Sequence, residues 1–98
     1  MYIVAMQIEF RITQASSLKD KRRIVKSIIQ KCQQQYKVSI AEVSKLDKMN
    51  NGVVGIALVT NSQRHGESVL QKCLNFIESN YLIETTSVEW FDGRGEQG

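Results

Sequence analysis

The sequence predicts one α+β domain, in which a four-stranded antiparallel sheet carries two helices on one face. Apolar residues recur at every second position in some segments, as in strands, and at helical spacing in two others. The 98 residues are 42% apolar and 23% charged and include no proline, which is typical of a single globular unit. We expect this domain to cover residues 1–92, with a frayed tail at 93–98.

The first strand and the first helix are predicted over residues 2–12 and 18–35. Apolar and mixed residues alternate from Tyr2 onward, which is the period of a strand with one buried face. The period changes to that of a helix at Leu18. Ser17 is followed three residues later by Asp20, which resembles a capping box with Asp in place of Glu.

The middle of the chain predicts a hairpin. Residues 37–46 are rich in β-branched side chains, and residues 53–60 are apolar at almost every position, as in a central strand. Between them, "DKMNNG" predicts a turn in which Asn51-Gly52 takes positive φ.

The second helix is predicted to begin after a cap at Asn61 or Ser62 and to end near Asn80, an acceptable left-handed terminator. Residues 81–91 then form the last strand. This order of elements, with right-handed crossovers and both helices on one face, gives the ferredoxin-like βαββαβ sandwich. The predicted sheet order is 4-1-3-2, with the first and third strands in the centre.

The positive charge is concentrated in the first half of the chain. The formal charge is +6 over residues 1–50 and −3 over residues 51–98, and the densest basic cluster is "SLKDKRRIVK" at 17–26. At 100° per residue, four of its cations form a stripe beside the apolar face, whereas Lys21 points inward. Cations at a helix N-terminus oppose the helix dipole, which favours a functional reason for them.

Two interpretations of this cluster stay open. It is either a solvated face that keeps the protein soluble or a surface that contacts phosphates. On the second interpretation, the nucleic-acid-binding residues are Lys19, Lys21, Arg22, Arg23 and Lys26, with Lys48 and Arg64 at the rim. The partner would be RNA or a ribosomal subunit.

The open face of the sheet predicts a second kind of contact. The residues of the first strand on that face are Ile3, Ala5, Gln7 and Glu9, and the third strand has no aromatic residue. An RNA-recognition motif stacks bases on aromatic residues of these strands, so that mode of binding is not expected. The apolar part of the face, with Ile3 and Ala5, suggests instead a homodimer that uses the chain as a protein-interaction or ligand-sensing domain.

Residues for catalysis or metal binding do not form a recognisable constellation in the sequence. Cys32 and Cys73 fall at apolar helix positions without CxxC spacing, and His65 is expected on the surface. We therefore expect no enzyme, no cofactor and no metal. The sequence contains neither a long apolar run nor a signal-peptide pattern, so a cytoplasmic location without membrane contact is expected.

Three stretches, "SLKDKRRIVKSIIQK", "VSIAEVSKLD" and "GIALVTNSQRHGESVLQKCLNFIE", resemble the YlxP-like family of small bacterial proteins of unknown function. The resemblance covers about residues 2–91 and implies a ferredoxin-like fold. It also implies, by association only, a role near translation or ribosome assembly, because genes of this family commonly neighbour those of a translation initiation factor and a ribosome-binding maturation factor. It supplies no catalytic residues. Relatives often have an aromatic residue in the turn that reads "LDKMNN" here.

Overall fold

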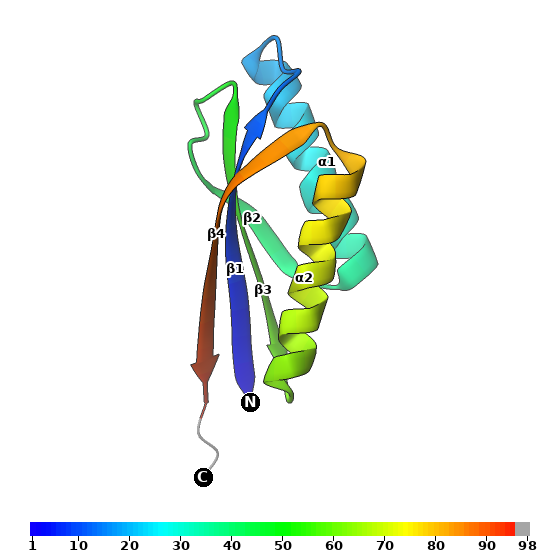
Figure 1. The fold of residues 1–98 in the computed structure, drawn as a ribbon, viewed down its shortest axis with the longest axis vertical. Helices are drawn as coiled ribbons and strands as arrows, with labels where there is room; N and C mark the ends of the chain where they lie inside the picture. The colour runs from blue at the N-terminus through cyan, green and yellow to red at the C-terminus, as the bar shows by residue number, and fades with distance from the viewer. Residues whose placement is uncertain (96–98) are drawn as a thin grey trace.

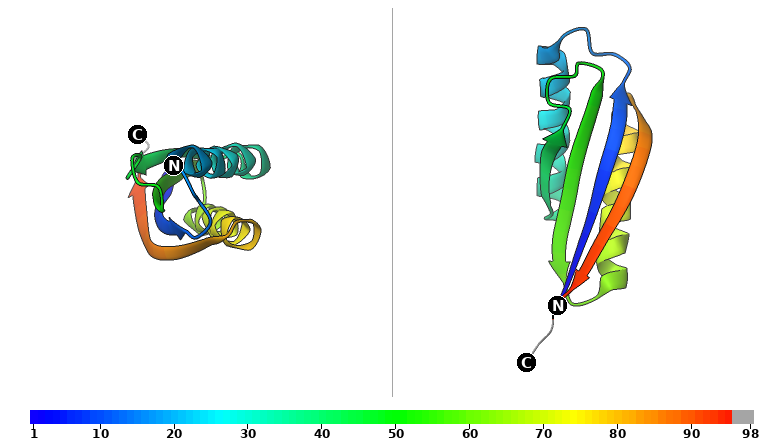
Figure 2. Two further views of the ribbon diagram at one scale, coloured as in Figure 1. Left: turned by 90° about the horizontal axis from the view of Figure 1, so that it is seen from above. Right: turned by 90° about the vertical axis from the view of Figure 1, so that its left-hand side faces the viewer.

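The chain forms six elements, which the computed structural model describes over residues 1–95. They are β1 (Tyr2–Ile12), α1 (Leu18–Tyr36), β2 (Ser39–Ser44), β3 (Asn51–Thr60), α2 (Gln63–Asn80) and β4 (Ile83–Arg94). The strands pair antiparallel in the order β2-β3-β1-β4 (Figure 1), which is the predicted order read from the other edge. Both helices lie on the same side of the sheet (Figure 2), so the predicted ferredoxin-like architecture is confirmed.

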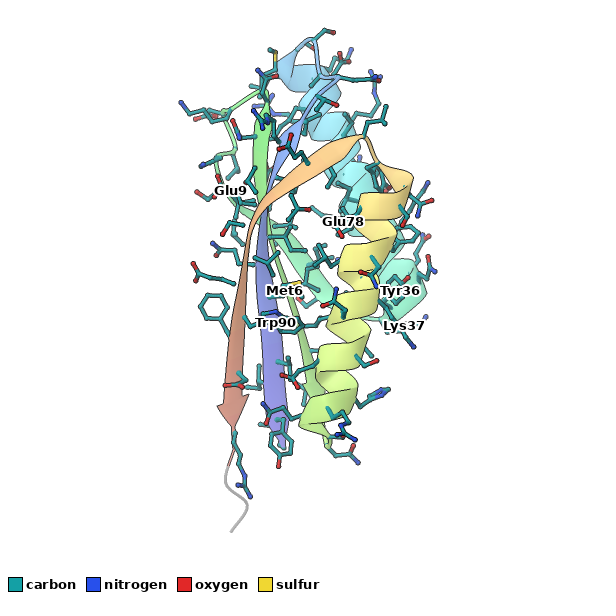
Figure 3. All side chains as sticks on the ribbon, viewed as in Figure 1. Met6, Glu9, Tyr36, Lys37, Glu78 and Trp90 are labelled. Carbon is teal, nitrogen blue, oxygen red and sulfur yellow. The ribbon has the colours of Figure 1, made fainter. Side chains whose placement is uncertain are left out.

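The core lies between the helices and the side of the sheet that faces them. Val4, Met6, Ile8 and Phe10 of β1 all point to this side, as strand alternation requires, and none is more than 1% exposed. They pack with the apolar stripes of both helices. Figure 3 shows Met6 and Trp90, which are paired across β1 and β4, on the helix side of the sheet, and Glu9 on the open side.

Both helices begin at a serine cap. The Ser17 hydroxyl accepts a hydrogen bond from the Asp20 N–H at 3.1 Å, and the Ser62 hydroxyl accepts one from the His65 N–H at 3.2 Å. The Asp20 carboxylate accepts in return from the N–H and O–H of Ser16, one residue before the cap. The predicted Ser17 cap is confirmed, and Ser62 rather than Asn61 caps α2.

Predictions that relied on positive φ were wrong at two places. Asn51-Gly52 is not a turn but the start of β3, and none of the described glycines has positive φ. Gly52 lies opposite Phe10, and a Cβ there would lie 2.7 Å from the Phe10 ring, so close packing explains this glycine. The left-handed residue near the hairpin is Lys45 (φ 56°), the first residue after β2.

The end of α2 also differs from the prediction. The helix ends at Asn80 as predicted, but Asn80 is not among the residues with positive φ, and Tyr81 after it is extended with φ −132°. The left-handed terminator belongs to α1 instead, where Lys37 has φ 57° and its N–H donates to the carbonyl of Gln33.

Besides β3, which begins at Asn51 rather than at 53, two more strands have other bounds than predicted. β2 covers only Ser39–Ser44 of the predicted 37–46. β4 begins two residues later than predicted and continues to Arg94, because β1 offers a pairing partner as far as Tyr2, opposite Arg94. The tail expected from 93 onward is therefore partly wrong: the N–H of Gly95 still donates to the Met1 carbonyl at 2.9 Å. The rest of that tail, 96–98, lies outside the described residues.

The molecule is elongated, with extents of 52 × 21 × 20 Å. One end holds the start of α1 and the β2–β3 connection, and the other end holds residue 1 and the start of α2 (Figure 1). Over residues 1–95, neither helix combines the length and the apolar character needed to cross a membrane.

Candidate anion-binding surface

Four cations in the first three turns of α1 project into solvent. Lys19, Arg22, Arg23 and Lys26 are all exposed, and we call them the α1 basic surface. Arg23 lies 3.9 Å from Asp20, whereas the other three form no ion pair with any described residue. Lys19, Arg22 and Lys26 are therefore available to an external anion without the loss of an internal partner among the described residues.

Lys21 does not belong to this surface, which corrects its prediction as a nucleic-acid-binding residue. Its side chain is 0% exposed, and its Nζ lies 2.6 Å from Oε2 of Glu42. The same ammonium donates to the carbonyls of Lys45 at 2.9 Å and Leu46 at 3.3 Å. All three N–H donors of Lys21 have partners within the protein, as a buried cation requires, so none remains for a phosphate.

The buried contacts of Lys21 hold the β2–β3 connection against the start of α1. Lys48 lies in this connection, at the same end of the molecule as the α1 basic surface, and it is exposed. Its predicted place near the rim is therefore compatible with the fold. Lys45, three residues earlier, turns to the open sheet face and pairs with Glu9.

Arg64 cannot lie at the rim of this surface. It is in the first turn of α2, and α2 begins at the end of the molecule opposite to the start of α1 (Figure 1). The prediction failed because sequence position does not show at which end of the sheet a helix begins.

A groove opens beside the α1 basic surface, where the start of α1 meets the connection between α2 and β4. Its volume is about 370 Å³. The residues that line it come from three segments: Ile12 and Gln14 after β1, Asp20, Arg23 and Ile24 on α1, and Asn80, Tyr81 and Leu82 after α2. Arg23 belongs both to this groove and to the α1 basic surface. No motif in the sequence indicated the groove, because its three walls are far apart in the chain.

Hydrogen bonds from the α2–β4 connection, which forms one wall of the groove, hold it against the other two walls. The hydroxyls of Tyr81 and Ser27 lie 2.8 Å apart, which ties the α2–β4 connection to α1. The N–H and the hydroxyl of Thr13 both donate to the carbonyl of Leu82. The walls therefore meet through direct contacts rather than through solvent.

The open sheet face carries an apolar patch that is larger than predicted. Ile3 is 44% exposed and Ala5 is half-buried. Val59 lies beside Ile3, and Phe91 lies beside Ala5, with exposures of 65% and 49%. Paired residues of neighbouring strands share a face, so these four side chains form one patch. Sequence reasoning missed Phe91. A β-bulge between Thr85 and Ser87 determines which side chains of β4 point to the open face of the sheet.

The other residues that could take part in catalysis or metal binding do not lie together as a site within the described chain. Cys32 and Cys73 are buried in the core, and burial raises the pKa of their thiols to about 11 and about 12. Both thiols are therefore protonated at neutral pH. His65 is exposed as expected. Within residues 1–95, no three His, Cys, Asp or Glu side chains gather in a way that could hold a metal ion.

Comparison with known proteins gives a direct family assignment. Residues 3–90 match the model of a family described as "Protein of unknown function (DUF503)". The chain belongs to the DUF503 family. It is also 39% identical to the uncharacterized protein YlxP of Bacillus subtilis (strain 168) over 87 aligned residues. The aligned region covers 87% of this chain and 95% of that protein.

The fold of this DUF503 chain resembles that of a solved structure. A de novo designed protein with a ferredoxin fold, LFR1 1, matches 88% of this chain and 84% of its own with a TM-score of 0.54 at 19% identity. This likeness concerns the fold alone.

The buried ion pair joins two of the stretches on which the resemblance to this family was based. Lys21 comes from "SLKDKRR" and Glu42 from "VSIAEV". Part of that sequence pattern therefore has a structural role in this chain, because it fixes the connection after β2 to α1. Of the exposed cations beside Lys21, only Arg23 has a carboxylate partner among residues 1–95, and that partner, Asp20, lies on the same helix.

Proposed function

We propose that this protein is a non-enzymatic, cytoplasmic RNA- or ribosome-associated protein that contacts phosphates through the α1 basic surface. Lys19, Arg22, Arg23 and Lys26 provide the contacts, and Lys48 contributes from the β2–β3 connection. The observation that carries the proposal is that three of the four α1 cations lack any intramolecular carboxylate within the described chain.

The arrangement of charge supports an external anion. The four cations crowd the N-terminal half of α1, and the helix dipole disfavours Lys19, in the first turn, by roughly 0.3–1 kcal/mol. Nearby like charges add a few tenths of a kcal/mol per pair. A polyanion that neutralises these charges removes both penalties and gains the entropy of counterion release.

Binding to RNA is expected to fall steeply with salt. Four phosphate contacts predict that affinity drops roughly 50- to 150-fold between about 50 and 200 mM monovalent salt. Co-sedimentation with ribosomal subunits and anisotropy with labelled RNA, each across a salt series, measure this dependence. Ribosomal subunits are chosen because of the association that the family resemblance implies. Absence of binding at low salt, or binding that salt does not change, would contradict the proposal.

The open sheet face favours a second candidate function, a homodimeric protein-interaction or ligand-sensing domain. We propose that Ile3, Ala5, Val59 and Phe91 meet the same patch of a second copy. The patch runs without a break across the three neighbouring strands β3, β1 and β4, and a contiguous exposed apolar patch is typical of a protein–protein contact. This candidate does not compete with the first one, because the helices lie on the other side of the sheet.

Placing a charge in this patch is expected to separate the dimer. Phe91→Asp introduces a carboxylate that would be desolvated at the interface, so this variant should sediment as a monomer at a high micromolar concentration at which the wild type is a dimer. Val88→Asp is the matched control, since Val88 is on the same strand and exposed but pairs with Ile8 on the helix side. A wild-type monomer at that concentration would refute the second candidate.

A further inference from the structure

The groove beside the α1 basic surface has the size and the lining of a small-ligand site. Its volume of about 370 Å³ lies within the range of about 300–1,000 Å³ typical of such sites. Ile24 and Leu82 supply the accessible apolar surface: Ile24 is partly exposed and Leu82 is 64% exposed, whereas Ile12 is buried at 2%. A flat apolar ring can therefore lie against these side chains.

Polar groups at the edge of the groove add specificity to this apolar surface. They are the carboxylate of Asp20, the guanidinium of Arg23 and the amides of Gln14 and Asn80. Because Arg23 is shared with the α1 basic surface, a chain of phosphates bound to that surface would pass beside the groove. A ligand that joins a phosphate backbone to a flat ring with polar edges is a single-stranded polynucleotide.

Asp20 favours one base over the others. Its Oδ2 accepts both hydrogen bonds from Ser16, whereas its Oδ1 is 3.9 Å from Arg23, beyond hydrogen-bond distance. The side-chain hydrogen bond from Ser16 lowers the pKa of Asp20, as does the backbone one, so this carboxylate is ionised and only accepts at neutral pH. Guanine presents two adjacent N–H groups, N1–H and the 2-amino group, and the free Oδ1 of Asp20 has two lone pairs with which it can accept from both.

We propose that the groove holds one unpaired guanine of single-stranded RNA, with Asp20 accepting from its N1–H and amino groups and Arg23 contacting its flanking phosphate. This inference rests on the proposed RNA function and adds a base preference to it. The apolar side of the base then lies against Leu82 and Ile24.

The experiment compares short uridine oligoribonucleotides that carry one central guanine, inosine, adenine or uridine, by anisotropy at low salt. One well-placed pair of base contacts is worth about 1–3 kcal/mol, so the guanine oligomer should bind about tenfold more tightly than the adenine and uridine oligomers. Inosine lacks the 2-amino group and should lose most of this preference. Asp20→Asn should remove the preference while the salt-dependent binding of all oligomers remains.

The possible failures are distinguishable. Equal binding of the guanine and uridine oligomers by the wild type, with binding still dependent on the α1 cations, overturns the guanine site and leaves the RNA function intact. Absence of binding to every oligomer overturns both. The inosine comparison needs no variant, so it stays decisive even where Asp20→Asn weakens the start of α1.

Discussion

Replacing Lys21 with methionine is expected to lower the free energy of unfolding by about 3 kcal/mol. Removing one partner of a buried ion pair costs about 3–5 kcal/mol, because the remaining charge is left buried without compensation. The Glu42 side chain retains 16% exposure, which places the expected loss at the lower end of that range. The carbonyls of Lys45 and Leu46 also lose a donor.

Chemical denaturation of Lys21→Met and a matched control measures this loss. Lys26→Met removes a cation of the same helix that is exposed and unpaired, so its stability should stay within about 0.5 kcal/mol of the wild type. The double variant Lys21→Met/Glu42→Leu should recover at least half of the loss, since an apolar pair replaces the uncompensated carboxylate. A single variant as stable as Lys26→Met would show that the ammonium of Lys21 does not hold the connection.

Reversing three charges of the α1 basic surface is expected to weaken RNA binding about 100-fold or more at low salt. Each lost contact between unit charges near 4 Å in water is worth about 1 kcal/mol, and the new carboxylates add repulsion. The variant is Arg22→Glu/Arg23→Glu/Lys26→Glu, and the measurement is the same anisotropy and co-sedimentation series. All three side chains are exposed, and substitutions at exposed positions usually change stability by no more than about 0.5 kcal/mol each, so the fold should be retained.

The control for this variant changes the net charge equally at other places. Arg64→Glu/Lys72→Glu/Arg94→Glu also takes the formal net charge from +3 to −3 but leaves the α1 basic surface unchanged. It should keep most of the affinity and the salt dependence of the wild type. Equal weakening by both triple variants would mean that only net charge matters, and equal binding by the wild type and the α1 variant would exclude this surface.

Periodicity predicted the fold well because each element carries its own local signal. The alternation in β1 and the apolar stripes of the helices follow directly from which side chains are buried. The helical angle of Lys21 also indicated that it points inward. Its role could not be predicted, because Glu42 and the carbonyls of the β2–β3 connection are distant in sequence and meet Lys21 only in the folded chain.

The candidate site was predictable only where it lies on a single helix. The exposed cations of α1 follow from the helical wheel, whereas the groove needs three segments to come together. The position of Arg64 at the far end depends on the direction of α2 across the sheet. Phe91 points to the open face because one extra residue, Thr86, shifts the alternation of side chains along β4. The hydrophobic pattern of that strand does not reveal this shift.

The pairing of Gly95 with Met1 places both ends of the described chain together, at the end of the molecule away from the α1 basic surface. A fluorophore or an affinity tag attached at either end would therefore stand clear of the RNA contacts, with most of the 52 Å length between them. The same proximity suits circular permutation: a short linker could join the two ends, and new termini could open near Lys48. Such a permutant would carry its label next to the candidate binding surface and could report ligand arrival directly.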